Sequence, residues 1–406
     1  MIYNLGKLSS VLDSQDIDML LVSTRENINY FTGIRPVIKE LNPYYGECYL
    51  VICRQSPDVV HVVHSCGECD QITESKTSIG LVHTYGTFHR ELPDASVLRG
   101  DEVAIHTWTS NSARHLNAQQ ALSSLLQELG VTPSTRIGFD EDGIAHSTLA
   151  SMQEQFGRDT LVLASALIRQ IRRVKTPYEV EMLTLAARCN EAAIKQVTDA
   201  VHVGISEVQI GKIFESAVVG LGGRPELTMI KIGREAVGGQ RQQRADITLQ
   251  RGDLLWFDSN TRYQGFWADL ARVYAYGDVT DATARRYAAL REGMLHAGRL
   301  IRPGMSGKDV FNMTMECVRS NGFPAYRRHH VGHGIGHEAY ERPILAPGED
   351  AQVEQGMVIS VETPYYEFGL GALHLEDPLL VGVEGNTFLT KDPCPELGII
   401  ATSSFR

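Results

Sequence analysis

Two acidic residues end two apolar segments in the second half of the chain. Asp258 follows the run LLWF, and Glu362 follows the run MVISV. Each run predicts a buried strand, and a carboxylate at the end of a buried strand is costly unless it is paired or coordinated. A second acid follows in both places, Asp269 after Asp258 and Glu376 after Glu362. Four acids at matching positions favour a metal site. The alternative is that they cap strands or pair with arginines.

Histidines are concentrated in one short segment. HHVGHGIGH (329–337) contains four of the chain's 14 histidines, His329, His330, His333 and His337. Glycines on both sides of His333 let the backbone approach a ligand closely. Carboxylates together with an imidazole suit Mn, Zn, Co or Fe, and two such ions ~3.5–4 Å apart share bridging carboxylates. The residue types therefore predict a centre for divalent metal ions.

The region that carries these residues reads as a duplication. VGISEVQIGKIFESAVVGLGGRPE (203–226) resembles PGMSGKDVFNMTMECVRSNGFPAY (303–326), and RGDLLWFD parallels QGMVISVE. Long helical segments precede both copies, at 177–203 and about 281–301. Two copies of helix, helix and strands around a pseudo-two-fold axis would bring the two pairs of acids together.

The first part of the chain reads as a compact α/β domain. Helical spacing predicts a helix at 116–129, and short apolar runs between polar stretches predict strands. The predicted strands are 18–22, 48–53, 59–63, 78–82, 102–105 and 136–139. After a basic run, Thr176 and Pro177 form a helix start with a glutamate three residues after the cap. We expect the domains to be 1–164 and 165–406.

Composition narrows the classes of function. The chain has 38 Lys+Arg against 49 Asp+Glu, a net charge of −11, which argues against a protein that coats nucleic acid or anionic lipid. No stretch approaches the ~20 apolar residues of a membrane helix, and seven cysteines are too sparse, and odd in number, for a disulfide framework. We expect a cytoplasmic protein that acts on a small molecule and binds neither nucleic acid nor membrane.

The segment 168–395 resembles the pita-bread metallopeptidase superfamily, which includes methionine aminopeptidase, aminopeptidase P, prolidase and creatinase. The five ligand positions of that family match this sequence in order, at Asp258, Asp269, His333, Glu362 and Glu376. The resemblance implies a creatinase/prolidase-like N-terminal α/β domain. An α+β pita-bread catalytic domain with an internal pseudo-two-fold duplication would follow it.

The same resemblance implies roles for the ligands. Asp258 and Asp269 would hold one ion, His333 would hold the second, and Glu376 would bridge them. Glu362, also a ligand, would act as general base for a metal-bound water. We expect two divalent ions, manganese first, with zinc, cobalt or iron as alternatives. The implied reaction is hydrolysis of an amide bond in a short peptide, as in Xaa-Pro dipeptidase or aminopeptidase P, by a homodimer.

The residues expected to face the substrate depart from the family. Tyr340 stands where the peptidases carry a histidine seven residues after the ligand histidine. Arg241 stands at or near the position of an upstream histidine, and His374 replaces an arginine before the last ligand. We assign Tyr340 and His337 to catalysis beside Glu362, because a tyrosine hydroxyl can donate to an oxyanion. The predicted substrate-binding residues are Arg241, His329, His330 and His374.

These departures leave two questions open. A guanidinium binds a carboxylate bidentately, so Arg241 would suit a dipeptide or a small zwitterion equally well; the alternative is that it lies in a solvated loop. The substrate is then either a peptide or a small zwitterion. A zwitterion would be the substrate of a creatinase-like or ectoine-hydrolase-like C–N hydrolase, or of a dimethylsulfoniopropionate-lyase-like enzyme. Metal-free binding modules also share the fold, but they lose ligands, whereas this chain keeps all five.

Overall fold

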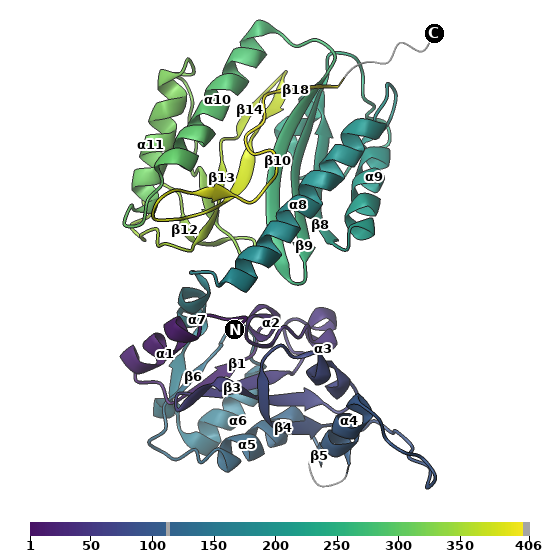
Figure 1. Cartoon of the computed structure of the whole chain (residues 1–406), viewed down its shortest axis with the longest axis vertical. Helices are drawn as coiled ribbons and strands as arrows, with labels where there is room; N and C mark the ends of the chain where they lie inside the picture. Colours follow the sequence, from purple (N-terminus) through teal and green to yellow (C-terminus); the bar gives the residue numbers. More distant parts are fainter. Residues whose placement is uncertain (111–113, 401–406) are drawn as a thin grey trace. The chain divides into compact units, whose positions relative to one another are not determined.

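The computed structural model describes residues 1–110 and 114–400. Contacts divide the chain into two compact units, Met1–Arg172 and Arg173–Arg406. Each unit has its own large sheet, as Figure 1 shows. The helix α7 (Ser165–Arg172), which lies after the boundary expected at residue 165, packs against α1 (Leu5–Ser14) and groups with the first unit.

The first unit is a seven-stranded mixed sheet in the order β5-β4-β3-β2-β1-β6-β7. Leu122 and Leu125 of its helix α5 (Ala118–Glu128) pack on Leu21 and Val51 of the central strands. Its other elements are β1 (Met19–Val22), α2 (Arg25–Thr32), α3 (Val37–Leu41), β2 (Tyr49–Cys53), β3 (Ser56–Ser65), η1 (Cys69–Glu74), β4 (Ser78–Tyr85), α4 (Asp101–Thr109), β5 (Arg114–His115), α5 (Ala118–Glu128), β6 (Ile137–Phe139), α6 (His146–Phe156), η2 (Arg158–Thr160) and β7 (Leu161–Leu163).

One predicted element of this unit was wrong. Residues 102–105, expected to form a strand, lie in the helix α4. A short apolar run does not distinguish a strand from a helix by its periodicity. Asp101 and Glu102 occupy the first turn of α4, where acidic side chains interact favourably with the positive end of the helix dipole.

The second unit has a nine-stranded sheet whose main path is β12-β11-β13-β16-β10-β9-β8. Two short strands extend it, β17 beside β16 and β18 beside β10. Its elements are α8 (Pro177–Ala200), α9 (Glu207–Gly220), β8 (Arg224–Ile232), η3 (Gly233–Gly238), β9 (Leu254–Tyr263), β10 (Phe266–Tyr276), α10 (Asp281–Leu300), α11 (Gly307–Ser320), β11 (Gly332–Gly334), β12 (Glu341–Ile344), β13 (Val358–Glu362), β14 (Tyr365–Glu367), β15 (Gly371–Leu373), β16 (Glu376–Leu380), β17 (Thr387–Phe388) and β18 (Gly398–Ile400).

The internal duplication is confirmed by matching local geometry in the two halves. Ser206 and Ser306 cap α9 and α11 with the same capping box, and each makes an isolated β-bridge within its own half. Gly204 and Gly304, two residues earlier, have φ values of 86° and 93°. Because this left-handed conformation favours glycine, the same turn leads into the second helix of both copies.

The sheet of the second unit separates apolar from acidic side chains. Phe257 of β9 packs in one apolar cluster with α8 and α9, and Val361 of β13 packs in another with α10 and α11. Figure 1 shows these two helix pairs beside the strands. Successive side chains of a strand point to opposite faces. Asp258 follows Phe257 and Glu362 follows Val361, so both carboxylates point away from the helices.

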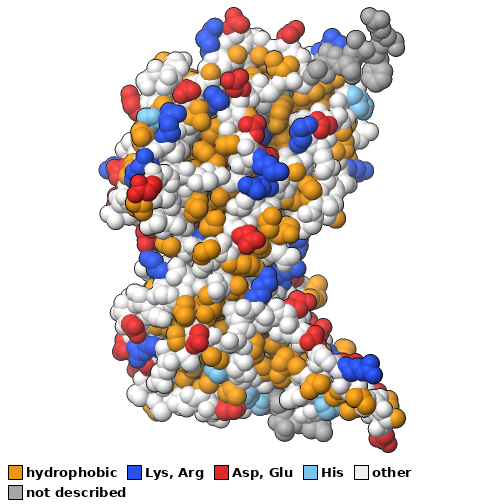
Figure 2. Space-filling view, in the orientation of Figure 1, with side chains coloured by type: hydrophobic (Ala, Val, Ile, Leu, Met, Phe, Trp, Pro, Cys, Tyr) orange, Lys and Arg blue, Asp and Glu red, His pale blue; other side chains and the backbone are white. Residues whose placement is uncertain are grey.

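The surface carries charges of both signs. Figure 2 shows acidic and basic side chains interspersed with small apolar groups over the face in view. Within residues 1–110 and 114–400, none of the helices combines the length and the apolar character needed to cross a membrane.

Candidate metal centre

Strand pairing gathers the four predicted acids around Ala271 of β10. Ala271 pairs with Asp258 on β9 and with Glu376 on β16, and Glu376 pairs with Glu362 on β13. Directly paired residues point to the same face of a sheet, and Asp269 shares that face because it lies two residues before Ala271. A shift of one residue in any of these pairings would turn a carboxylate toward the helices.

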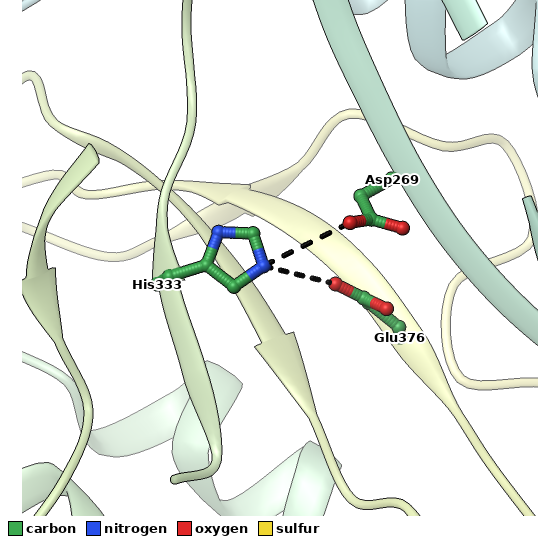
Figure 3. A group of neighbouring side chains, drawn as sticks. All are labelled: Asp269, His333 and Glu376. Carbon is green, nitrogen blue, oxygen red and sulfur yellow. Dashed lines mark ion pairs between the residues drawn. The ribbon is translucent and has the colours of Figure 1, made fainter. Parts of the chain in front are cut away.

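The strand β11 adds the histidine to the same face. His333 pairs with Ser360, which lies two residues before Glu362. Its Nε2 lies 3.8 Å from Asp269 Oδ2 and 3.6 Å from Glu376 Oε1, as drawn in Figure 3. Its Nδ1 lies 3.0 Å from the backbone carbonyl oxygen of the next residue. Because a carbonyl only accepts, Nδ1 donates in this contact, and Nε2 is turned toward the two acids.

The geometry of this cluster fits a divalent cation. His333 Nε2 and Asp269 Oδ1 are buried and have no hydrogen-bond partner among the described residues. Ligand atoms of Asp269, His333 and Glu376 lie within 4.8 Å of one another, and so do those of Glu362, His374 and Glu376. Buried carboxylates and an imidazole that converge in this way are stabilised by a bound metal ion.

Crowding opposes ionisation of three of the acids. Burial, and next the charge of Asp269, raises the pKa of Asp258 well above its ordinary value. Burial also raises the pKa of Glu376, with Asp269 as the next cause, and it raises the pKa of Asp269 to about 6. A cation among these carboxylates would reverse the effect by favouring their charged forms.

Glu362 differs because two histidines contact its carboxylate. His330 Nδ1 lies 2.7 Å from Oε1, and His374 Nε2 lies 3.2 Å from Oε2. Burial by itself would raise the pKa of Glu362, but these two contacts outweigh burial and hold that pKa below its usual range. His374 is buried and stacks on Trp256, with ring centroids 6.4 Å apart. The carboxylate of Glu362 is therefore ionised and fixed in orientation.

Tyr340 lies at the mouth of the cluster. Its ring stacks on the ring of His333, with centroids 3.6 Å apart and planes 17° apart. Tyr340 also lines a cavity of about 340 Å³ together with Asp258 and Glu362. Because Tyr340 is 55% exposed, its phenol lies between the cluster and solvent, where a bound substrate would contact it.

The other predicted histidines have different surroundings. His329 and His330 line the same cavity, and their rings are 4.2 Å apart. His337 is buried and packs against Phe266, with ring centroids 4.1 Å apart. It is not one of the described residues that line the cavity, so a catalytic role for His337 stays a prediction without direct geometric support.

Arg241 is engaged by acids of its own neighbourhood. Its guanidinium lies 2.8 Å from Glu207 and 2.8 Å from Glu235. Glu207 is fully buried at the first turn of α9, where an unpaired carboxylate would be strongly destabilising. Arg241 therefore neutralises Glu207 and does not lie in a freely solvated loop. Its assignment to substrate binding stays a prediction that this ion pair disfavours.

Several residues that line the cavity were not identified from the sequence, among them Trp256, Arg328 and Tyr366. Trp256 lies two residues before Asp258, so strand alternation places both on one face and was an available signal. Arg328 comes directly before the histidine segment, but a pair of arginines is usually a solvated surface. In the structure its guanidinium lies over the ring of Tyr366, 5.6 Å from the centroid.

Comparison with known proteins places both units in described families. The profile of metallopeptidase family M24 matches residues 181–382, and that of the creatinase/prolidase N-terminal domain matches residues 5–174. The chain is 29% identical over 397 residues to an Xaa-Pro dipeptidase of Lactobacillus helveticus, an alignment that spans 96% of this chain and 97% of the relative.

Solved structures show the same fold. An Xaa-Pro dipeptidase from Bacillus anthracis has a TM-score of 0.75 at 22% identity, and an X-Pro aminopeptidase from Thermotoga maritima has a TM-score of 0.75 at 18% identity. Both likenesses cover 98% of this chain and 99% of the other. With both family matches in chain order and a cluster that fits metal ions, the chain belongs to metallopeptidase family M24 and is a hydrolase of the metallopeptidase type.

Proposed function

We propose that the protein hydrolyses the Xaa-Pro bond of a short peptide with the help of two divalent metal ions. The observation that carries the proposal is the buried convergence of Asp269, His333 and Glu376, whose ligand atoms lie within 4.8 Å of one another. The substrate class is supported by the relatives named Xaa-Pro dipeptidase in Lactobacillus helveticus and Pyrococcus furiosus.

The five converging residues would hold the metal ions. Asp258 and Asp269 would bind one ion, His333 would bind the other, and Glu362 and Glu376 would contribute to both. Bound ions of this kind lower the pKa of water toward neutrality and polarise a scissile carbonyl. Manganese is our first expectation for this oxygen-rich set, and zinc, cobalt and iron accept the same donors.

The chain's own residues supply proton transfer and charge stabilisation. Glu362 would accept a proton from the attacking water and then deliver it to the leaving nitrogen. His330 and His374, which contact its two oxygens, would keep the carboxylate in position. The hydroxyl of Tyr340 would donate to the carbonyl oxygen as that atom gains negative charge.

The proposal is tested by turnover of manganese-reconstituted protein on Xaa-Pro dipeptides, Xaa-Ala dipeptides and Xaa-Pro tripeptides. The Glu362→Gln variant, prepared in the same way, measures the background. Cleavage of Xaa-Pro substrates that the variant lacks would support the proposal. A metal-loaded protein that cleaves none of the panel would refute it.

A second candidate substrate is a small zwitterion. The rings of Trp256, Tyr340 and Tyr366 line the cavity beside the carboxylates of Asp258 and Glu362, and aromatic faces attract organic cations. Creatine, ectoine and sulfonium acids therefore form the second arm of the panel. Turnover in this arm alone would assign the site to a non-peptide reaction.

We also propose that the protein acts as a homodimer in the cytoplasm. The homodimer is carried over from the prolidase and creatinase branch that the chain resembles. Light scattering coupled to gel filtration tests it, because a dimer of a 44.9 kDa chain has twice that mass.

A further inference from the structure

A short segment, residues 237–240, forms one wall of the cavity that contains Glu362. Its backbone packs closely on Trp256, because a Cβ at Gly239 would lie 2.6 Å from an atom of the indole ring. The turn η3, which leads into this wall, meets β15 just as closely. A Cβ at Gly371 of β15 would lie 2.1 Å from the carbonyl oxygen at the start of η3. The conformation of this one segment therefore decides the width of the cavity.

The carboxylate of Glu207 holds the chain on both sides of the wall. Before the wall, the backbone N–H of Ile232 donates to Oε1 at 3.2 Å. After the wall, the backbone N–H of Arg244 donates to Oε2 at 3.2 Å, and the guanidinium of Arg241 donates to both oxygens, at 2.8 and 3.1 Å. One carboxylate therefore closes the loop 232–244.

Glu207 is itself fixed by an element outside this loop. It is 0% exposed and lies in the first turn of α9, which begins with the capping box of Ser206. Its own backbone N–H donates to the carbonyl oxygen of Ile247 at 3.1 Å. Burial lowers the pKa of Lys231, and the charge of Glu207 opposes this change, so a second cation also lies near the carboxylate. The loop is therefore held from a rigid, charge-balanced anchor.

Arg241 connects this anchor to the wall. Its guanidinium also donates to Glu235, at 2.8 Å, and to the carbonyl oxygen of Gln242, at 2.8 Å. Glu235 comes just before the wall and Arg241 directly after it, so their ion pair closes the wall on itself. Arg241 is not one of the described residues that line the cavity. Its influence on the cavity therefore passes through the position of the wall.

We propose that Glu207 and Arg241 are positioning residues that clamp the wall 237–240 and thereby set the affinity of the cavity for its substrate. The inference rests on the proposed function, in which a peptide enters this cavity. A wall that is ordered before binding costs no further conformational entropy when the substrate binds. Because neither residue contacts the reacting atoms, loosening of the clamp should raise KM and leave proton transfer by Glu362 unaffected.

The test uses the manganese-loaded full-length protein with the substitution Glu207→Gln, which keeps the size of the side chain but removes its charge. We expect KM for Ala-Pro to rise about 10-fold, with kcat within about 3-fold of the wild type and metal content unchanged. Hydrogen–deuterium exchange of the segment 232–244 should become faster, because two of its amides lose a charged acceptor. Exchange in the rest of the catalytic unit should stay the same.

A double variant distinguishes positioning from direct contact with the substrate. Arg241→Gln by itself leaves the buried charge of Glu207 unpaired and should destabilise the protein, whereas Glu207→Gln together with Arg241→Gln removes both charges. If Arg241 acts through Glu207, the double variant should have the same KM as Glu207→Gln, within about 2-fold. A further rise in KM would show that Arg241 contacts the substrate and would overturn its positioning role.

Arg244→Gln is the matched control. Arg244 lies in the same loop and is exposed, and its side chain pairs with Asp246 while its backbone holds the contact with Glu207. This variant should leave KM, kcat and the exchange of the segment 232–244 unchanged. Thermal unfolding of all variants checks that folding is preserved.

Two results would overturn the inference. The first is unchanged exchange of the segment 232–244 in Glu207→Gln, and the second is faster exchange with an unchanged KM. Failure of the proposed function is a separate result, in which the wild type cleaves no Xaa-Pro peptide. Exchange in the presence of L-proline then decides the role of the wall. Protection of 232–244 that is lost in Glu207→Gln would support the inference, and absence of protection in the wild type would refute it.

Discussion

Besides its expected metal ligands, this site contains an aromatic residue, Tyr340, whose ring stacks on His333. The phenol covers the face of the imidazole, and the surrounding burial and carboxylates raise the pKa of Tyr340. Tyr340 is therefore protonated at neutral pH. Its hydroxyl can donate a hydrogen bond to a developing oxyanion but cannot act as a base.

Removal of this hydroxyl should slow the reaction without affecting the cluster. Tyr340→Phe keeps the ring that stacks on His333 and should lower kcat by at least ~10-fold, because one donor to the transition state is lost. Steady-state kinetics on the best peptide of the panel, with metal content measured in parallel, checks this. An unchanged kcat would assign Tyr340 to packing.

Glu362 should be indispensable for turnover but not for folding. Glu362→Gln keeps the size of the side chain and its contacts with His330 and His374, but it cannot accept a proton. We expect kcat to fall by about 10²- to 10⁴-fold, the usual contribution of a general base. Circular dichroism and thermal unfolding should resemble those of the wild type. Appreciable activity in a metal-loaded variant would contradict the role.

At the scale of single elements, β11 depends on a glycine. Gly332 has a φ of 138°, and a Cβ at this position would lie 2.3 Å from the carbonyl oxygen of Ser360 on β13. Gly332→Ala should therefore lower the free energy of unfolding by about 2 kcal/mol or more and weaken metal binding by displacing His333. Gly348→Ala, where a Cβ meets open space, is the control in denaturant titrations. Equal stability of the two variants would contradict this reasoning.

The start of α8 contains a buried acid that makes stability depend on pH. Burial raises the pKa of Glu179 to about 7, while nearby Lys175 opposes the rise and Glu341 adds to it. The folded protein therefore holds this proton more tightly than the unfolded chain. The resulting stabilisation is complete below pH 4.5, and it is lost as the pH rises through about 7.

Glu179→Gln should remove this dependence and keep the capping box, in which Glu179 accepts from the backbone N–H of Thr176. Above pH 7 we expect the variant to exceed the wild type by on the order of 2 kcal/mol, and the difference should shrink toward pH 5. Denaturant unfolding across this range measures it, with exposed Glu181→Gln as the control. A difference that does not change with pH would contradict the assignment.

At the scale of the whole molecule, the metal cluster lies within one unit of the chain. All five converging residues belong to Arg173–Arg406, and Met1–Arg172 contributes none of them. Loss of metal ions should therefore destabilise the catalytic unit in particular, because four carboxylates then repel one another without a counter-charge.

Chelation should accordingly shift the thermal unfolding of the catalytic unit. A ligand at 100 times its Kd stabilises by about 2.7 kcal/mol, which corresponds to a Tm shift of about 5–10 °C for a unit of this size. Calorimetry before and after treatment with a chelator, followed by addition of manganese, measures the shift and its reversal. Unchanged unfolding after complete metal removal would mean that the cluster does not bind metal in the native protein.

The sequence by itself determined the features that depend on local order along the chain. The repeat of 203–226 at 303–326 predicted two matching helices, and the structure begins both with the same capping box, at Ser206 and Ser306, because a cap uses groups only a few residues apart. Acids at the ends of apolar runs, a histidine-rich segment and a family resemblance identified the residues that the structure brings together. The segment 102–105 was misassigned because four apolar-rich residues fit a helix as well as a strand.

Only the tertiary structure decided which charges face the cavity. Arg241 lies 34 residues from Glu207 in sequence, and their ion pair exists because η3 and the loop after it return to the buried start of α9. His374 contacts Glu362 across 12 residues, while Arg328 lines the cavity beside the carboxylates of Asp258 and Glu362. An arginine has the same charge wherever it occurs, and its role follows from the acids that folding places beside it.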